Sequence, residues 1–194
     1  MRHHAAVLLA ATGALVVVPS VAFADAGLPM LAFVWPGMGF ALVPVIVIET
    51  VVMMRLLKTT LGRTAVVMTV ANLVTTVVGV PLTWGAMFGL QALLGGGGAG
   101  PDIGTIAGKV FAVTVQAPWL LPYQEQIRWM VPAAALFLLV PFFFASWLIE
   151  YWVARWTMRD LDRRALRRAV MWANLASYAL LALVALGFLV AAIV

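Results

Sequence analysis

The 194-residue chain is 65% hydrophobic and 10% charged, with a formal net charge of +5 and no cysteine. A soluble globular domain is about half apolar and about a quarter charged, so lipid is expected to cover much of this chain. The lack of cysteine excludes disulfides, cysteine metal sites, thiolate nucleophiles and lipid attachment through cysteine.

Residues 1–24 have the three parts of a secretory signal peptide: a basic start, an apolar stretch over 5–18 and a small-x-small cleavage site ending at Ala24. Because the apolar stretch is shorter than the about 20 residues of a span, we predict cleavage there, with an uncleaved first helix as the alternative. Cleavage would remove both histidines, His3 and His4. The mature chain could then hold no Ser-His-Asp triad, no histidine-ligated haem and no histidine or cysteine zinc site.

Four long apolar stretches follow, over residues 29–54, 64–94, 129–154 and 169–194. Each exceeds the about 20 residues needed to cross the hydrocarbon. Only helices and closed barrels satisfy their own backbone there, and these stretches lack the short alternating strands of a barrel, so we predict an all-α integral membrane protein. The second stretch contains Gly79 and Pro81. Since proline removes a backbone hydrogen bond, we expect a bend near Val80, with the part from Gly85 onward tilted or lying at the interface.

These spans divide the mature chain into a first transmembrane hairpin over 25–94, a connection over 95–128 and a second hairpin over 129–194. The connection opens with GGGGAGPDIG, which predicts flexibility and lacks the Gly-Lys-Ser/Thr ending of a phosphate-binding loop. Its aromatic residues, among them Trp119 and Tyr123, favour an interfacial segment that covers the outer helix ends. A partner-binding surface is the alternative.

Two short connections carry nine of the twelve basic residues: Arg55, Lys58 and Arg63 in the first, and Arg155, Arg159, Arg163, Arg164, Arg167 and Arg168 in the second. With four spans both connections lie on one side, and the positive-inside rule makes that side the cytoplasm of a bacterial-type inner membrane. The mature N-terminus, the 95–128 connection and the C-terminus would lie outside. The arginines are expected to meet anionic lipid headgroups, and their clustering beside the spans argues against nucleic-acid binding.

The two predicted hairpins share a pattern. Ile-Glu closes the first helix of each, at Glu49 and Glu150, and Ala-Asn-Leu-x-Thr/Ser follows each basic turn, with Asn72 and Asn174. The Glu-to-Asn spacing is 23 positions in one hairpin and 24 in the other. We therefore predict a parallel repeat, related by an axis along the membrane normal, with a chance match in apolar sequence as the alternative.

All four residues of this pattern lie within a few helical turns of an arginine, so they are expected to form one polar layer in or at the edge of the inner leaflet. Intramembrane carboxylates are costly and usually face protein, so Glu49 and Glu150 could form a functional pair that binds a proton, a cation or a polar headgroup. Alternatively, each glutamate reaches an asparagine or arginine and only fixes its hairpin. A stripe suited to helix packing follows on the second span: Asn72, Thr75, Thr76, Gly79 and Thr83.

The mature chain offers few nucleophiles and no set of metal ligands, so we expect no enzyme, no catalytic or metal site and no cofactor. The first hypothesis is a non-enzymatic scaffold, accessory subunit or assembly partner that contacts other membrane subunits or a second copy of itself. The alternative is a small transporter, or a proton- or ion-translocating component, that uses the Glu49/Glu150 layer.

Cysteine labelling tests the predicted topology. Because the chain has no native cysteine, the single substitutions Gly62→Cys and Leu161→Cys report on the two basic turns, and Asp102→Cys reports on the long connection. In intact cells we expect a membrane-impermeant maleimide to label only Asp102→Cys. All three variants should react in lysed cells, and labelling of either turn in intact cells would contradict the orientation.

Overall fold

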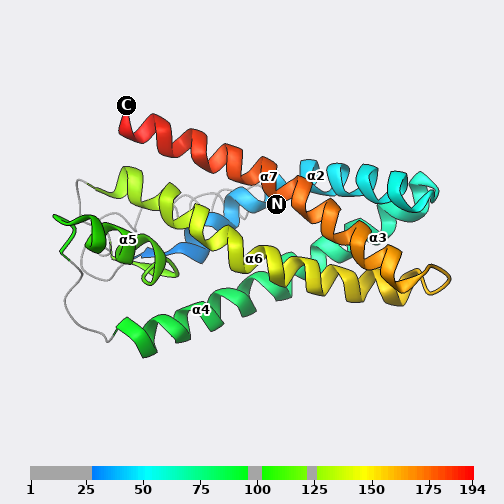
Figure 1. Ribbon diagram of the computed structural model, residues 1–194, viewed down its shortest axis with the longest axis horizontal. Helices are drawn as coiled ribbons and strands as arrows, with labels where there is room; N and C mark the ends of the chain where they lie inside the picture. The colour runs from blue at the N-terminus through cyan, green and yellow to red at the C-terminus, as the bar shows by residue number, and fades with distance from the viewer. Residues whose placement is uncertain (1–27, 96–101, 122–125) are drawn as a thin grey trace, which may run out of the picture.

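A computed structural model of the chain describes residues 28–95, 102–121 and 126–194 (Figure 1). Its helices are α2 (Met30–Leu57), α3 (Leu61–Val74), the π-helix η2 (Thr75–Gly79), α4 (Val80–Gly95), α5 (Ile106–Thr114), α6 (Ile127–Thr157) and α7 (Arg163–Ile193). Two short strands, β1 (Leu28–Pro29) and β2 (Trp119–Leu120), pair antiparallel. The predicted signal peptide and its cleavage site at Ala24 lie outside the described residues.

Four helical segments are long and apolar enough to cross a membrane: Pro36–Leu57, Leu61–Leu94, Ile127–Thr157 and Arg163–Ile193. The prediction of four apolar helices is confirmed, and the fold fits a membrane protein. Their ends extend into the basic connections, beyond the apolar stretches. In α7 this extension has a local cause, because the Asp162 side chain accepts a hydrogen bond from Ala165 N at 2.8 Å and caps the helix seven residues before the apolar stretch begins at Ala169.

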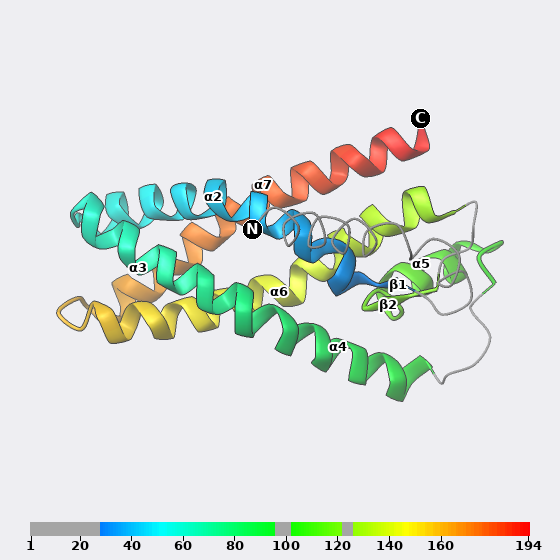
Figure 2. The same ribbon diagram turned by 180° about the vertical axis from the view of Figure 1, so that it is seen from behind.

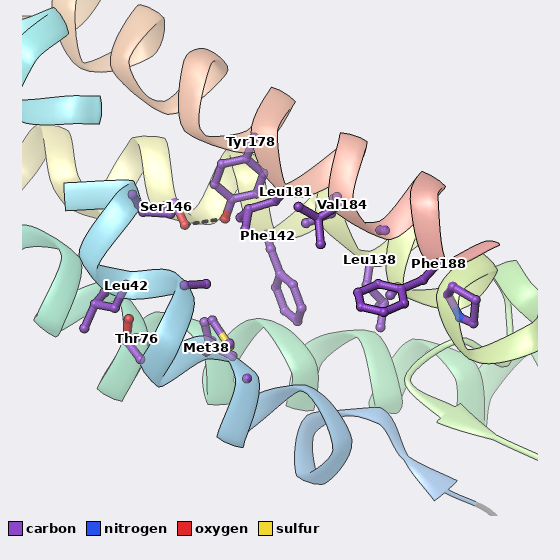
Figure 3. A pocket seen from close by; sticks show the side chains of 18 of the residues that line it. Met38, Leu42, Thr76, Leu138, Phe142, Ser146, Tyr178, Leu181, Val184 and Phe188 are labelled. Atoms are coloured by element: carbon purple, nitrogen blue, oxygen red, sulfur yellow. Dashed lines mark hydrogen bonds between the residues drawn. The ribbon is translucent and has the colours of Figure 1, made fainter. Parts of the chain in front are cut away.

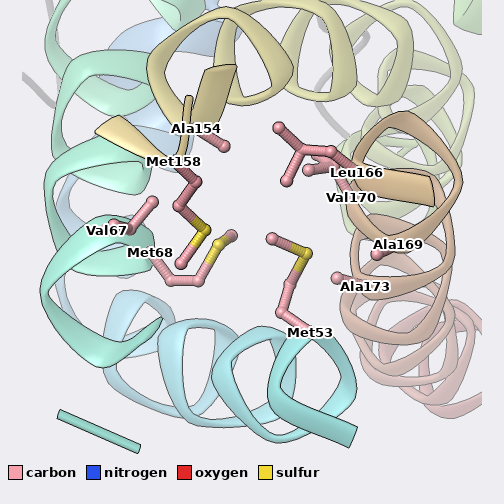
Figure 4. Packing of buried hydrophobic residues seen from close by; sticks show 9 residues of the cluster. All are labelled: Met53, Val67, Met68, Ala154, Met158, Leu166, Ala169, Val170 and Ala173. Atoms are coloured by element: carbon pink, nitrogen blue, oxygen red, sulfur yellow. The ribbon is translucent and has the colours of Figure 1, made fainter. Parts of the chain in front are cut away.

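The four long segments form a bundle in which each packs against two neighbours. α2 contacts α3 and α7, and α6 contacts the same two helices, so α2 and α6 lie across the bundle from each other (Figure 4). The α2–α3 and α6–α7 turns lie at the same end of the molecule, here called the basic end, and the helices diverge toward the other end (Figures 1 and 2).

At the basic end, apolar side chains fill the centre of the bundle: Met53, Val67, Met68, Ala154, Met158, Leu166, Ala169, Val170 and Ala173. The three methionines are fully buried and meet on the bundle axis (Figure 4). Unbranched thioether chains fit irregular spaces well, so they close the gap that the alanines of α6 and α7 leave. This methionine core blocks the middle of the bundle on that side.

The two basic turns are joined by an ion pair between Arg63 and Asp160. Arg63 Nη1 donates to Asp160 Oδ2 at 2.9 Å, and Nη2 donates to the other carboxylate oxygen. The hydrogen bonds from Arg63 lower the pKa of Asp160 from 3.8 to about 2. The stabilisation from this pair is therefore present above about pH 4 and is lost as the pH falls toward 2. Both groups are exposed, so the pair mainly aligns the turns.

At the other end, α5 and the small sheet pack on α6 around a second core: Met30, Ala112, Ala117, Leu120, Met130, Ala134 and Leu138. Side chains of α4 form hydrogen bonds with the backbone of residues 118–119, next to and within β2. Trp84 Nε1 donates to Pro118 O at 2.8 Å, and the Gln91 amide exchanges two hydrogen bonds, of 2.9 and 3.0 Å, with the Trp119 backbone. The sheet departs from the all-α prediction, because two-residue strands are too short to give an alternating pattern.

The second span contains a π-helix where a bend was predicted. Instead of a bend at Val80, the π-helix η2 precedes Pro81, and α4 continues the course of α3 to Gly95 (Figure 2). Val80 N donates to Thr75 O, five residues back, which widens the turn just before a proline that has no N–H to donate. The part from Gly85 onward thus belongs to the same helical segment, Leu61–Leu94, as the residues before Val80.

Gly79 determines how closely η2 approaches α6, because a Cβ placed there would lie 2.6 Å from Ile149 Cδ1. We expect Gly79→Ala to be less stable than Gly85→Ala by about 0.5–1.5 kcal/mol, since Ile149 must leave its preferred rotamer and this offsets the gain in helix propensity. Gly85 is the matched control because nothing lies within 4 Å of its Cβ position. Thermal unfolding in detergent measures the difference. Ile149→Val, which removes Cδ1, should rescue Gly79→Ala, and equal stability of the two alanine variants would contradict the contact.

Candidate functional site

The two glutamates singled out from the sequence meet at the centre of the bundle. Glu49 on α2 is 0% exposed and Glu150 on α6 is 1% exposed, and their carboxyl groups lie next to each other. They project toward each other from helices on opposite sides of the bundle. Among the described residues, no arginine or lysine forms an ion pair with either glutamate. The structural alternative allowed an asparagine or an arginine partner, and each glutamate here has the asparagine.

Each glutamate is held by the asparagine of its own hairpin. Asn72 Nδ2 donates to Glu49 Oε2 at 2.5 Å and to the backbone carbonyl four residues earlier at 3.0 Å. Asn174 Nδ2 makes the same two bonds, to Glu150 Oε2 at 2.6 Å and to the carbonyl four residues earlier at 3.1 Å. One amide proton thus fixes the asparagine against its helix while the other orients the carboxyl group.

A second contact crosses from one hairpin to the other. Ser177 Oγ donates to Glu49 Oε1 at 2.6 Å, although the two residues are 128 positions apart. Thr75 holds the matching place in the first Ala-Asn-Leu-x-Thr/Ser motif, and its side chain lies against Glu150. The last residue of each motif is therefore placed against the glutamate of the other hairpin. The Thr75 hydroxyl is buried and has no hydrogen bond of normal geometry.

Ser146 and Tyr178 extend this polar layer away from the basic end. Their hydroxyl oxygens are 2.7 Å apart (Figure 3). Ser146 lies one helical turn before Glu150 on α6, and Tyr178 follows Ser177 on α7. Neither residue was predicted as part of the site. The i, i+4 spacing of Ser146 and Glu150 was the available signal, because it places both on one face of a helix.

A cavity of about 750 Å³ begins at the polar layer and runs away from the basic end between α2, η2, α6 and α7. Its inner end carries the polar side chains: Glu49, Asn72, Thr75, Ser146, Glu150 and Tyr178. Its walls are mostly apolar, and Phe142 and Phe188 extend into it (Figure 3). Because the methionine core fills the bundle on the other side, the cavity reaches the glutamates from one side only.

The predicted stripe on the second span divides between two environments. Asn72, Thr75 and Gly79 are buried, and Gly79 makes the close approach to α6. Thr76 and Thr83 are half-buried, and Thr76 lines the cavity. Part of the stripe thus packs against protein, and part faces open space.

The nine basic residues of the two turns lie around the basic end. Arg155 is half-buried, and the other eight are exposed: Arg55, Lys58, Arg63, Arg159, Arg163, Arg164, Arg167 and Arg168. Arg63 is paired with Asp160, as described above. The exposed guanidinium groups are accessible to anionic headgroups and lie on the far side of the methionine core from the cavity.

The chain matches no protein-family model, no curated protein and no solved structure. What it does is therefore inferred from the site itself, which combines a buried carboxyl pair, neutral hydrogen-bond donors and an apolar cavity.

Ser177→Ala tests the contact between the hairpins. Loss of the hydroxyl leaves Glu49 Oε1 with one donor fewer in a buried site, so the free energy of unfolding should fall by about 1–3 kcal/mol. Thr76→Ala is the matched control: it removes a hydroxyl in the same layer that lines the cavity and forms no side-chain hydrogen bond within the described structure. Thermal unfolding in detergent compares the two variants. An equal loss in both would show that the hydrogen bond contributes nothing of its own.

Proposed function

We propose that this protein is a small membrane transporter, or a proton- or ion-translocating component, with the Glu49/Glu150 pair as its binding site. The observation that carries the proposal is a buried carboxyl pair, with no basic partner among the described residues, at the inner end of a cavity of about 750 Å³. Two ionised carboxyl groups that face each other in a low-dielectric interior repel strongly, so the pair must hold at least one proton or bind a cation. The asparagine and serine donors orient the carboxyl oxygens without supplying that positive charge.

A purely structural role for the pair accounts for less of what surrounds it. Hydrogen bonds between neutral amides would hold two hairpins together without placing two acids in contact inside a membrane. A structural pair also needs no cavity leading to it. Here the polar side chains gather at the inner end of the cavity, where its apolar walls stop.

We further propose that the two hairpins are parallel repeats related by an axis along the membrane normal. The matched asparagine–glutamate pairs and the crossed positions of Thr75 and Ser177 support this arrangement. Repeats of this kind move against each other as rigid units in many transporters, around a site near their interface. With the basic end in the cytoplasm, the cavity would open toward the outside, and the methionine core would be the inner closure.

A second candidate function is the scaffold or assembly partner, and the packing of α7 favours it. Only 6% of the most apolar window of α7 is buried within the molecule, and α4 and α7 diverge away from the basic end (Figure 1). A helix of another membrane protein, or of a second copy, could cover these surfaces. Purification in mild detergent would then recover a stoichiometric membrane partner or a homo-oligomer.

Proteoliposomes containing the purified full chain and an internal pH-sensitive dye test translocation. One assay imposes an inside-negative potassium diffusion potential and records proton uptake. The other imposes an inside-acid pH gradient and adds Na⁺, K⁺ or tetraethylammonium outside. We expect at least one assay to exceed protein-free liposomes several-fold, because each probes a charge that the carboxyl pair can carry.

The variants decide whether that flux uses the site. Glu49→Gln, Glu150→Gln and the double substitution should remove it, whereas Asp102→Asn should retain it, because this acid lies outside the cavity and its role as acceptor from Gly104 N survives the change. Wild-type rates no greater than those of the double variant in both assays would overturn the proposal.

A further inference from the structure

We propose that the cavity binds a lipophilic organic ammonium ion of drug-like size, with its charged nitrogen at the Glu49/Glu150 pair and its apolar groups against the walls. This inference rests on the proposed function, because it names the cargo of the same site. The argument uses the size and lining of the cavity, the distribution of charge along it and one hydroxyl group at its inner end.

The size and lining fit a small organic molecule better than an inorganic ion. Small-molecule sites enclose about 300–1,000 Å³ and combine apolar walls with a few placed polar groups. The cavity has about 750 Å³, and hydrocarbon side chains from α2, α6 and α7 make most of its wall. A metal ion would need a shell of oxygen ligands and would leave this apolar volume empty.

Charge is distributed unevenly along the cavity. The titratable groups that face its inner end are Glu49 from α2, Glu150 from α6 and Tyr178 from α7, while α3 and η2 contribute neutral Asn72 and Thr75. The one cationic side chain in the lining, within the described residues, is Arg128. It is 22 positions before Glu150 on α6, about 33 Å of helix rise from the pair. A positive group is therefore attracted inward, and an anionic headgroup is repelled.

Aromatic rings line the route to the pair. Phe142 and Phe188 extend into the cavity, and the Tyr178 ring lies beside its inner end (Figure 3). Aromatic faces attract cations and also pack against apolar groups, so this lining suits a molecule that is both charged and lipophilic.

The inner end also contains a hydroxyl group that, among the described residues, accepts no hydrogen bond. The Thr75 hydroxyl is buried, lines the cavity and lies next to Glu150, but it forms no hydrogen bond of normal geometry. The hydroxyl is placed to donate to Glu150, and its oxygen keeps lone pairs that can accept a hydrogen bond from a donor on the ligand. An ammonium N–H supplies this donor, whereas a quaternary nitrogen, which has no N–H, does not.

The glutamates are 0% and 1% exposed, so ligand contact requires a small rearrangement of the polar layer. A proton shared by the two glutamates, or a cation bound to them, neutralises the same two carboxyl groups as the ammonium ion does. The ammonium ion therefore replaces that proton or cation when it binds. Binding of the ammonium ion should therefore release a proton and weaken as the pH falls.

Equilibrium dialysis of the full chain in detergent tests the proposal with two probes of the same shape. One is 1-naphthylmethylamine, which is protonated at pH 8, and the other is neutral 1-naphthylmethanol. We expect the amine to bind saturably and at least 10-fold more tightly than the alcohol at pH 8. Its affinity should fall at pH 5.5, and its N,N,N-trimethyl derivative should bind more weakly than the amine.

The variants separate the charge of the site from its apolar walls. Glu49→Gln and Glu150→Gln should each weaken amine binding at least 10-fold and leave alcohol binding unchanged. Phe188→Ala should weaken both probes alike, and Asp102→Asn should weaken neither. If the glutamine variants do not fold, the pH dependence and the amine-to-alcohol ratio of the wild-type protein decide instead.

Equal affinity for the two probes, or amine binding that is unchanged at low pH, would overturn the inference. Failure here remains distinct from failure of the proposed function. Proton or cation flux without amine binding would leave translocation standing with another cargo, whereas amine binding without any flux would leave a binding site that does not translocate.

Discussion

The contact between two buried carboxyl groups is the constraint on which the rest of this bundle depends. An acid removed from water must be neutralised or fully hydrogen-bonded, and here the available partners are neutral amide and hydroxyl groups on all sides. Their geometry fixes the rotation of each long helix about its axis, because Glu49, Asn72, Glu150 and Asn174 must all face inward at one depth. The polar layer therefore sets the register of both hairpins.

The bundle is packed differently on the two sides of this polar layer. Toward the basic end, methionine and alanine side chains pack the axis, and the Arg63–Asp160 pair aligns the turns. Toward the other end the helices separate, and α5 with the small sheet packs on α6 and α4 instead of filling the axis. The basic end of the bundle is thus filled by packed side chains, whereas toward the other end the helices surround an apolar cavity. This asymmetry gives the carboxyl pair a single direction of access.

Much of the architecture could be predicted because lipid imposes strong rules on length and composition. The four apolar helices and the inward placement of Glu49 and Glu150 followed from hydropathy and from the recurring Ile-Glu and Ala-Asn-Leu-x-Thr/Ser patterns. Hydropathy could not give the helix ends, because Asp162 starts α7 within a polar stretch. It also could not give η2, a widened turn that lies just before Pro81 and whose last residue, Gly79, packs close to Ile149. The cavity was not predicted, because it arises from the divergence of helices whose sequences are uniformly apolar.

The crossed position of Ser177 bears on how such a protein could arise. In a single hairpin with this motif, the glutamate would have the asparagine donor but no hydroxyl donor. The serine or threonine of the motif lies against the glutamate of the other hairpin. Two identical hairpins would complete each other about a two-fold axis, as an isologous homodimer in which every contact occurs twice. On the proposal that the two hairpins are repeats, duplication and fusion of such a hairpin would keep each contact while the two copies diverge. The two turns differ in this chain, because the second carries six arginines and the first carries two arginines and one lysine.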